Sequence, residues 1–170
     1  MIIPRVPQTA ADVAGHYDEL DEAYRSIWGE HVHHGYWRTG RESSTEAAEA
    51  LVRLVAERLA PEPGQRGVDI GCGYGATAGW LAEHHGMHVT GFTLSEAQAA
   101  IGRTRPGLTC LVRDWLDNGL PDAAFDRAYA IESSEHMVDK ARFFTEAADE
   151  WRSAAEAPDA PELIRQRSRA

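Results

Sequence analysis

The chain has 170 residues, 43% of them hydrophobic, which suits one domain with a substantial core and hardly two. Its formal net charge is −10, whereas binding to nucleic acid or an anionic membrane needs clustered Lys and Arg. The sequence therefore predicts neither nucleic acid nor membrane as a partner, and no apolar run approaches the roughly 20 residues of a membrane span. With two cysteines and no secretory-type N-terminus, a cytoplasmic location is expected.

The N-terminal third has the periodicity of helices. Apolar residues spaced by three and four positions predict one helix over 10–28. Ser43 followed by Glu46 has the form of a capping box and predicts a second helix, which ends before Pro61. The segment 30–41 between them is a loop rich in histidine, glycine and aromatic residues.

From Gly67 onward, short apolar strands alternate with helices. The predicted strands are 68–70, 88–92, 109–112 and 127–131, and the predicted helices are 76–85, a short one opened by Ser95, and 138–151. This alternation predicts an α/β fold in which helices cover both faces of a mostly parallel sheet, a Rossmann-like three-layer sandwich.

A glycine-rich turn, Asp69-Ile70-Gly71-Cys72-Gly73-Tyr74-Gly75, follows the first predicted strand. Such a turn uses positive φ angles, and the helix behind it offers free N–H groups to a ligand. The turn also fits a loose dinucleotide fingerprint, and a plain strand-to-helix turn is the structural alternative. An acid inside the strand and a third glycine favour S-adenosylmethionine. The second strand also lacks the acid that a dinucleotide ribose requires.

Four segments together resemble class I S-adenosylmethionine-dependent methyltransferases of the tocopherol-methyltransferase-like group. The ribose-side segment is also similar to that of cyclopropane-fatty-acid-type enzymes. The segments are 27–37, 91–98, 121–126 and 131–140. They occur in the order of the family, and the resemblance covers roughly residues 17–144.

The resemblance implies S-adenosylmethionine as the cofactor and assigns residues to each of its parts. Asp69, Gly71, Gly73 and Gly75 would hold the methionine end. Thr93, Leu94 and Gln98 would border the ribose, and Asp114 and Trp115 would border the adenine. Glu132 would lie under the sulfonium. Without the resemblance, several of these residues are equally well explained as helix caps, turn residues or solvated acids.

On the acceptor side, the resemblance makes His136 the candidate catalytic residue. A histidine that titrates near neutrality is able to take the proton of an acceptor. His34, Tyr36 and Trp37 are expected to form a lid over an apolar acceptor. The histidines of segment 31–34 invite a metal interpretation, but no carboxylate or cysteine follows at ligand spacing, so no metal is predicted.

These features predict methyl transfer from S-adenosylmethionine to a small, hydrophobic, natural-product-like molecule, with O, N and C all open as the acceptor atom. One alternative is a non-catalytic protein that binds S-adenosylmethionine, and another is an NAD-dependent oxidoreductase. The predicted domain is 1–146, with N-terminal lid helices in 10–60 and the core in 64–146.

The Ala/Arg/Glu-rich segment 147–170 is expected to be a poorly ordered tail. The resembling enzymes continue from the corresponding helix into further strands, so the sheet is expected to be incomplete at its C-terminal side. The fourth strand would then be an exposed edge, which favours a homodimer or a partner that covers it.

Overall fold

A computed structural model describes residues 8–121 and 124–156. Four parallel strands form its centre, in the order β3-β2-β1-β4. They are β1 (Arg66–Ile70), β2 (His88–Thr93), β3 (Leu108–Val112) and β4 (Arg127–Tyr129). Every pairing is parallel, which confirms the predicted Rossmann-like α/β class.

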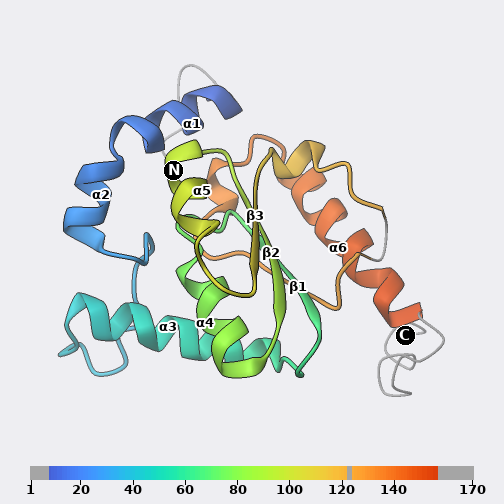
Figure 1. The fold of residues 1–170 in the computed structure, drawn as a ribbon, viewed down its shortest axis with the longest axis horizontal. Coiled ribbons are helices and arrows are strands. Elements are labelled where there is room, and N and C mark those ends of the chain that lie inside the picture. Colours follow the sequence, from blue (N-terminus) through green and yellow to red (C-terminus); the bar gives the residue numbers. More distant parts are fainter. Residues whose placement is uncertain (1–7, 122–123, 157–170) are drawn as a thin grey trace.

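In the part of the chain that the structure describes, six α-helices surround the sheet (Figure 1). They are α1 (Ala10–Glu19), α2 (Asp21–Trp28), α3 (Ser44–Leu59), α4 (Ala76–His85), α5 (Glu96–Gly102) and α6 (Lys140–Glu156), with two 3-10 turns, η1 (Trp115–Asp117) and η2 (Ser134–His136). In Figure 1, α6 lies on one side of the strands, while α3 and α4 lie on the other.

The two faces of the sheet carry separate hydrophobic clusters because successive strand residues point to opposite sides. On one face, Ile70 and Phe92 pack with Phe143 of α6. On the other face, Val89 packs with Leu81 of α4 and with α3. Each fully buried large apolar side chain contributes about 1.5–3 kcal/mol, so both helical layers stabilise the sheet.

The predicted single helix over 10–28 is wrong, because the chain breaks into α1 and α2 at Leu20. The residues on either side of the break are anchored to different parts of the core. Asp18 Oδ1 accepts hydrogen bonds from Ser95 Oγ at 2.5 Å and Ala97 N at 3.1 Å. Tyr74 Oη donates to Asp21 Oδ1 at 2.8 Å. These long-range contacts bend the segment, and apolar periodicity does not reveal them.

The helix α3 has the predicted capping box, in which Ser43 and Glu46 each accept a hydrogen bond from the other's backbone. Its assignment to the lid is wrong. Val52 and Ala56 are buried, and Ala56 belongs to the cluster that packs under the sheet. The helix that covers the carboxyl end of the sheet is α1, which packs on α5.

The C-terminal elements differ from the predicted bounds. The strand β4 ends at Tyr129, two residues early, because the chain turns away from the sheet and Glu132 adopts a left-handed φ of 48°. The helix α6 begins at Lys140, where Asp139 Oδ1 accepts from Arg142 N at 2.9 Å. The same helix continues to Glu156, so the expected domain boundary at 146 falls inside it; residues 157–170 lie outside the described residues.

The sheet edge and the character of the helices bear on possible partners. In the described residues, β4 forms one edge of the sheet, as expected of a sheet incomplete on that side. None of the described helices has the length and apolar character needed to cross a bilayer.

Candidate functional site

A cavity lies at the carboxyl ends of the parallel strands. After β1 the chain crosses to β2 and β3 on one side, and it later returns to β4 on the other, so β1 and β4 flank a topological switch point. Ligands of open α/β sheets bind at such a point. The space bounded by the lining residues is about 810 Å³, a value that includes the solvent at its open mouth.

The lining combines predicted cofactor residues with residues of α1 and of the segment after β4. It includes Gly71, Gly73, Thr93, Leu94, Gln98, Asp114, Trp115, Glu132 and His136, together with Ala10, Val13, Tyr17, Val32, Met137 and Val138. The structure thus brings nine of the predicted site residues to one cavity from four separate segments of the sequence.

A smaller polar pocket adjoins this cavity and shares Gly71 and Gly73 with it. Asp69, His31 and His33 line this pocket. The Nδ1 atom of His33 lies 2.7 Å from the carbonyl oxygen of His34, to which it donates, so Nε2 is the free ring nitrogen. Within the described residues, His33 Nε2 and His31 Nδ1 are buried without a hydrogen-bond partner. Buried polar atoms need partners, so this pocket fits a polar ligand group.

The glycines of the turn have different roles. Gly73 has a φ of 53°, and a Cβ there would extend into open space at the cavity. Gly71 has a φ of 86° and approaches the Ser133 side chain, where a Cβ would clash. Gly75 does not line either pocket, contrary to its predicted cofactor role. It precedes α4 with a φ of 70°, and a Cβ there would lie 2.2 Å from Leu108 Cδ2, so it serves packing between helix and strand.

Asp69 is buried in β1, opposite Tyr129 in β4. Burial raises the pKa of Asp69 to about 7. The polar Tyr129 hydroxyl nearby has the opposite, smaller effect of lowering this pKa. The Tyr129 hydroxyl does not complete a hydrogen bond with any described residue. A carboxyl group that titrates near neutrality therefore lies directly behind the glycine turn.

The residues predicted for the ribose also support one another. Thr93 Oγ1 donates to Gln98 Oε1 at 2.7 Å, and both side chains are buried. Ser95 Oγ accepts from Gln98 N at 3.1 Å, so the predicted cap of α5 is present. The Gln98 side chain, however, turns to Thr93 rather than back to Ser95, so the reciprocal half of the capping box is absent.

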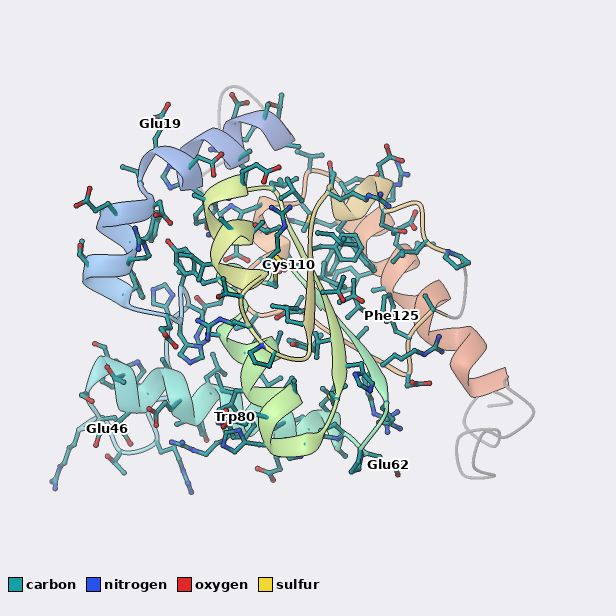
Figure 2. The ribbon with its side chains drawn as sticks, in the orientation of Figure 1. Glu19, Glu46, Glu62, Trp80, Cys110 and Phe125 are labelled. Carbon is teal, nitrogen blue, oxygen red and sulfur yellow. The ribbon has the colours of Figure 1, made fainter. Side chains whose placement is uncertain are left out.

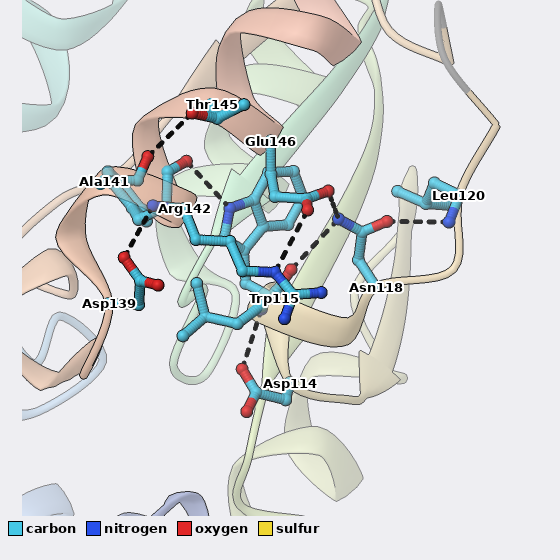
Figure 3. A network of polar contacts seen from close by, with 11 residues as sticks. Asp114, Trp115, Asn118, Leu120, Asp139, Ala141, Arg142, Thr145 and Glu146 are labelled. Carbon is cyan, nitrogen blue, oxygen red and sulfur yellow. Dashed lines mark hydrogen bonds and ion pairs between the residues drawn. The ribbon is translucent and has the colours of Figure 1, made fainter.

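Trp115 is joined to α6 by a network of polar contacts, and Asp114 caps the start of η1 (Figure 3). Asp114 Oδ1 accepts from Leu116 N at 2.9 Å, and Trp115 Nε1 donates to the carbonyl of Phe143 at 3.4 Å. Asn118 Nδ2 donates to the carbonyl of Trp115 at 3.1 Å and to Glu146 Oε2 at 3.1 Å. The cap interpretation of Asp114 is confirmed, and its position on the cavity is compatible with the adenine role as well.

Glu132 lies at the edge of the cavity and binds His34. Its Oε2 accepts from His34 N at 2.8 Å and lies 2.7 Å from His34 Nδ1. Burial raises the pKa of Glu132, but the hydrogen bonds from His34 outweigh this effect and lower it overall. The carboxylate is therefore ionised at neutral pH and places a negative charge on the cavity wall.

The expected lid is only partly correct. His34 reaches the cavity wall through Glu132, but Tyr36 and Trp37 do not line the cavity and are 42% and 47% exposed. Gly35 explains this, because a Cβ there would lie 2.3 Å from Ala47 Cβ, and the Tyr36 amide donates to the Ala47 carbonyl at 2.8 Å. The segment is thus held against α3, away from the mouth of the cavity.

Tyr17 of α1 is the important cavity residue that the sequence analysis missed. Its hydroxyl lies 3.0 Å from His136 Nε2, and the two rings meet edge to face. Tyr17 belongs to the apolar stripe of the first helix with Val13, and both line the cavity. Their spacing belongs to the periodicity that predicted a helix, but nothing in it identified His136 as the partner of Tyr17. Among the described residues, no group of three or more His, Cys, Asp or Glu side chains is arranged to hold a metal ion.

Comparison with known proteins assigns the family. The profile described as "Mycolic acid cyclopropane synthetase" matches residues 5–153. The chain belongs to this family of class I S-adenosylmethionine-dependent methyltransferases. Its sequence is 37% identical over 158 residues to a "Probable tocopherol O-methyltransferase, chloroplastic" from Oryza sativa subsp. japonica, covering 84% of this chain and 44% of that protein.

Two other proteins extend the comparison. An "O-methyltransferase cnsE" from Penicillium expansum is 36% identical over 141 residues, covering 78% of this chain and 51% of that protein. The crystal structure of the [4+2]-cyclase SpnF superimposes with a TM-score of 0.79 at 33% identity, covering 84% of this chain and 56% of that one. The chain thus spans about half the length of the proteins it matches.

Proposed function

We propose that this chain forms the cofactor-binding part of a methyltransferase that moves a methyl group from S-adenosylmethionine to an oxygen of a small hydrophobic molecule. The observation that carries the proposal is the pair of adjoining pockets at the switch point, which share Gly71 and Gly73. One pocket contains the residues expected to border the ribose and the adenine, and the other has buried polar atoms without partners among the described residues.

Each part of the cofactor has a set of candidate residues in the two pockets. Asp69, Gly71 and Gly73 would hold the methionine end, with the unpartnered nitrogen of His33 in the same pocket. Thr93, Leu94 and Gln98 would border the ribose, and Asp114 and Trp115 the adenine. When bound, S-adenosylmethionine supplies an electrophilic methyl group on a sulfonium cation. The ionised Glu132 at the cavity wall favours that positive charge.

His136 is proposed to take the proton of the acceptor hydroxyl. It lies on the cavity with Met137, Val138 and α1, which together form an apolar acceptor region. Methyl transfer mainly requires in-line positioning, and a base raises the nucleophilicity of the oxygen. The names of the relatives, a tocopherol O-methyltransferase among them, support oxygen as the acceptor atom and a hydrophobic molecule as the acceptor.

We also propose how the exposed edge of the sheet is covered and where the protein is located in the cell. The edge strand β4 is expected to pair with additional strands, either those of a longer chain or those of a second copy. Size-exclusion chromatography with light scattering would distinguish a monomer from a dimer. A cytoplasmic location stays a prediction, and it is tested by fractionation of the producing cells.

The second candidate function is cofactor binding without methyl transfer. It is favoured by the similarity to SpnF, a protein of similar fold that is named a [4+2]-cyclase and not a methyltransferase. The test is production of S-adenosylhomocysteine from S-adenosylmethionine with a panel of hydrophobic phenols and alcohols. Acceptor-dependent production that is lost in His136→Ala supports methyl transfer. Binding of cofactor without turnover of any acceptor would favour the second candidate.

A further inference from the structure

The two cysteines of the chain meet in the interior, although they are 38 residues apart. Cys72 lies in the glycine turn, and Cys110 lies in β3. Their Sγ atoms are 3.8 Å apart, in direct contact. Cys110 is buried near the centre of the molecule, as Figure 2 shows, whereas Cys72 is partly exposed and lines the small polar pocket.

Two glycines make room for the sulfur atoms. A Cβ at Gly91 of β2 would lie 2.7 Å from Cys72 Sγ, and a Cβ at Gly102 of α5 would lie 2.8 Å from Cys110 Sγ. Any larger residue at either position would push a sulfur out of place. The two sulfurs therefore occupy a tight niche between the turn, the sheet and α5, which keeps them facing each other.

From this juxtaposition we infer that Cys72 and Cys110 form a reversible disulfide on exposure to a peroxide, and that the disulfide weakens cofactor binding. Hydrogen peroxide converts one thiol to a sulfenic acid and releases water. The other thiolate then attacks that sulfur, forms the S–S bond and expels the second oxygen as water. Two thiols and one peroxide thus give one disulfide and two waters.

The electrostatics of the pair favour a thiolate at one of the two sulfurs. The hydrogen bond between the thiols lowers the pKa of Cys110. The same contact raises the pKa of Cys72, and burial raises it further. The thiolate is the form that reacts with a peroxide and with a sulfenic acid, so a lowered pKa at one member of the pair favours formation of the disulfide.

The effect on the cofactor follows from the position of Cys72. To reach the roughly 2.05 Å of an S–S bond, the sulfurs must approach by about 1.75 Å. Cys110 is buried in β3, which is hydrogen-bonded to β2, whereas Cys72 lies in a turn, so we expect the turn containing Cys72 to move more. Gly71 and Gly73, on either side of Cys72, line both pockets, so this movement would displace the surface proposed to hold the methionine end. This effect rests on the proposed function, whereas formation of the disulfide does not.

The test treats the purified full chain with hydrogen peroxide, followed by thiol titration, intact mass and calorimetry with S-adenosylhomocysteine. We expect loss of both thiols, a mass lower by two hydrogen atoms, no covalent dimer, and affinity reduced about tenfold or more until dithiothreitol is added. The Cys110→Ala variant should bind S-adenosylhomocysteine with the same affinity before and after treatment.

Several outcomes would overturn the inference. Two thiols that remain titratable, a disulfide only between chains, or addition of oxygen atoms without a disulfide would each exclude the internal bond. An internal disulfide that leaves the affinity unchanged would refute its effect on the cofactor. Failure of the untreated chain to bind S-adenosylhomocysteine would instead contradict the proposed function, since mass and thiol content still report on the disulfide.

Discussion

The hydroxyl of Tyr17 lies 3.0 Å from Nε2 of His136, which joins the N-terminal helix α1 to the segment after β4. The two residues are 119 positions apart, and their rings meet edge to face at a centroid distance of 5.7 Å. Burial raises the pKa of Tyr17, with smaller contributions from the charges of Tyr24 and Glu135, so the phenol stays neutral and fixes the imidazole by hydrogen bonding alone.

Replacing Tyr17 with phenylalanine removes this hydrogen bond and keeps the ring. We expect turnover to fall by up to about tenfold, the effect of one neutral hydrogen bond, because His136 is no longer held in one orientation. Affinity for S-adenosylhomocysteine, measured by calorimetry, should change less than twofold. Wild-type turnover in Tyr17→Phe would show that the contact does not position His136.

The variant His136→Ala tests the proposed base directly. We expect turnover to fall by roughly a hundredfold or more, the usual scale for a general acid–base group, with little change in cofactor affinity. His84→Ala is the matched control, since His84 stacks on Trp80 away from the cavity. If His136→Ala turns over normally, positioning alone accounts for catalysis.

Gly73→Val should abolish binding of S-adenosylhomocysteine, because the side chain would extend into the cavity that the ligand is proposed to fill. The substitution also strains the backbone, since the φ of Gly73 is 53°. Gly40→Val controls for strain: its φ is 75°, the space around it is open, and it does not line the cavity. Equal loss of binding in both variants would assign the effect to strain.

The buried Asp69 predicts a pH dependence of stability. Its pKa is about 7 in the folded chain, compared with an ordinary value of 3.8, so the folded state holds a proton that the unfolded state has lost. The free energy of unfolding should therefore fall by a few kcal/mol as pH rises from about 4 to about 7. Urea denaturation across this range should show a shallower decline in Asp69→Asn than in the wild type. The control, Asp117→Asn at an exposed site, should keep the wild-type slope.

Short sequence patterns predicted the positions of the main helices and strands well. The Ser43–Glu46 pattern located α3, and the turn after Asp69 located the boundary between β1 and α4, because both depend on residues close in the sequence. The cavity residues at the strand ends were assigned through the resemblance to methyltransferases, and the parallel sheet brings those ends together. The helix cap and the turn need no knowledge of distant contacts.

The errors arose where distant contacts decide the direction of a side chain. Gly35 fits against Ala47, and this approach turns Tyr36 and Trp37 away from the cavity. Likewise, the break at Leu20 is set by residues that contact α5 and the glycine turn. No periodicity or spacing within the segments 10–28 and 30–41 encodes these partners.

Titration calorimetry of the untreated chain with S-adenosylhomocysteine, and separately with NAD, tests the central claim most directly. The two ligands share an adenosine moiety, so the comparison isolates recognition of the methionine end by the pocket that contains Asp69 and His33. The account predicts saturable binding of S-adenosylhomocysteine with one site per chain and no detectable heat with NAD. Tight binding of NAD, with none of S-adenosylhomocysteine, would contradict it.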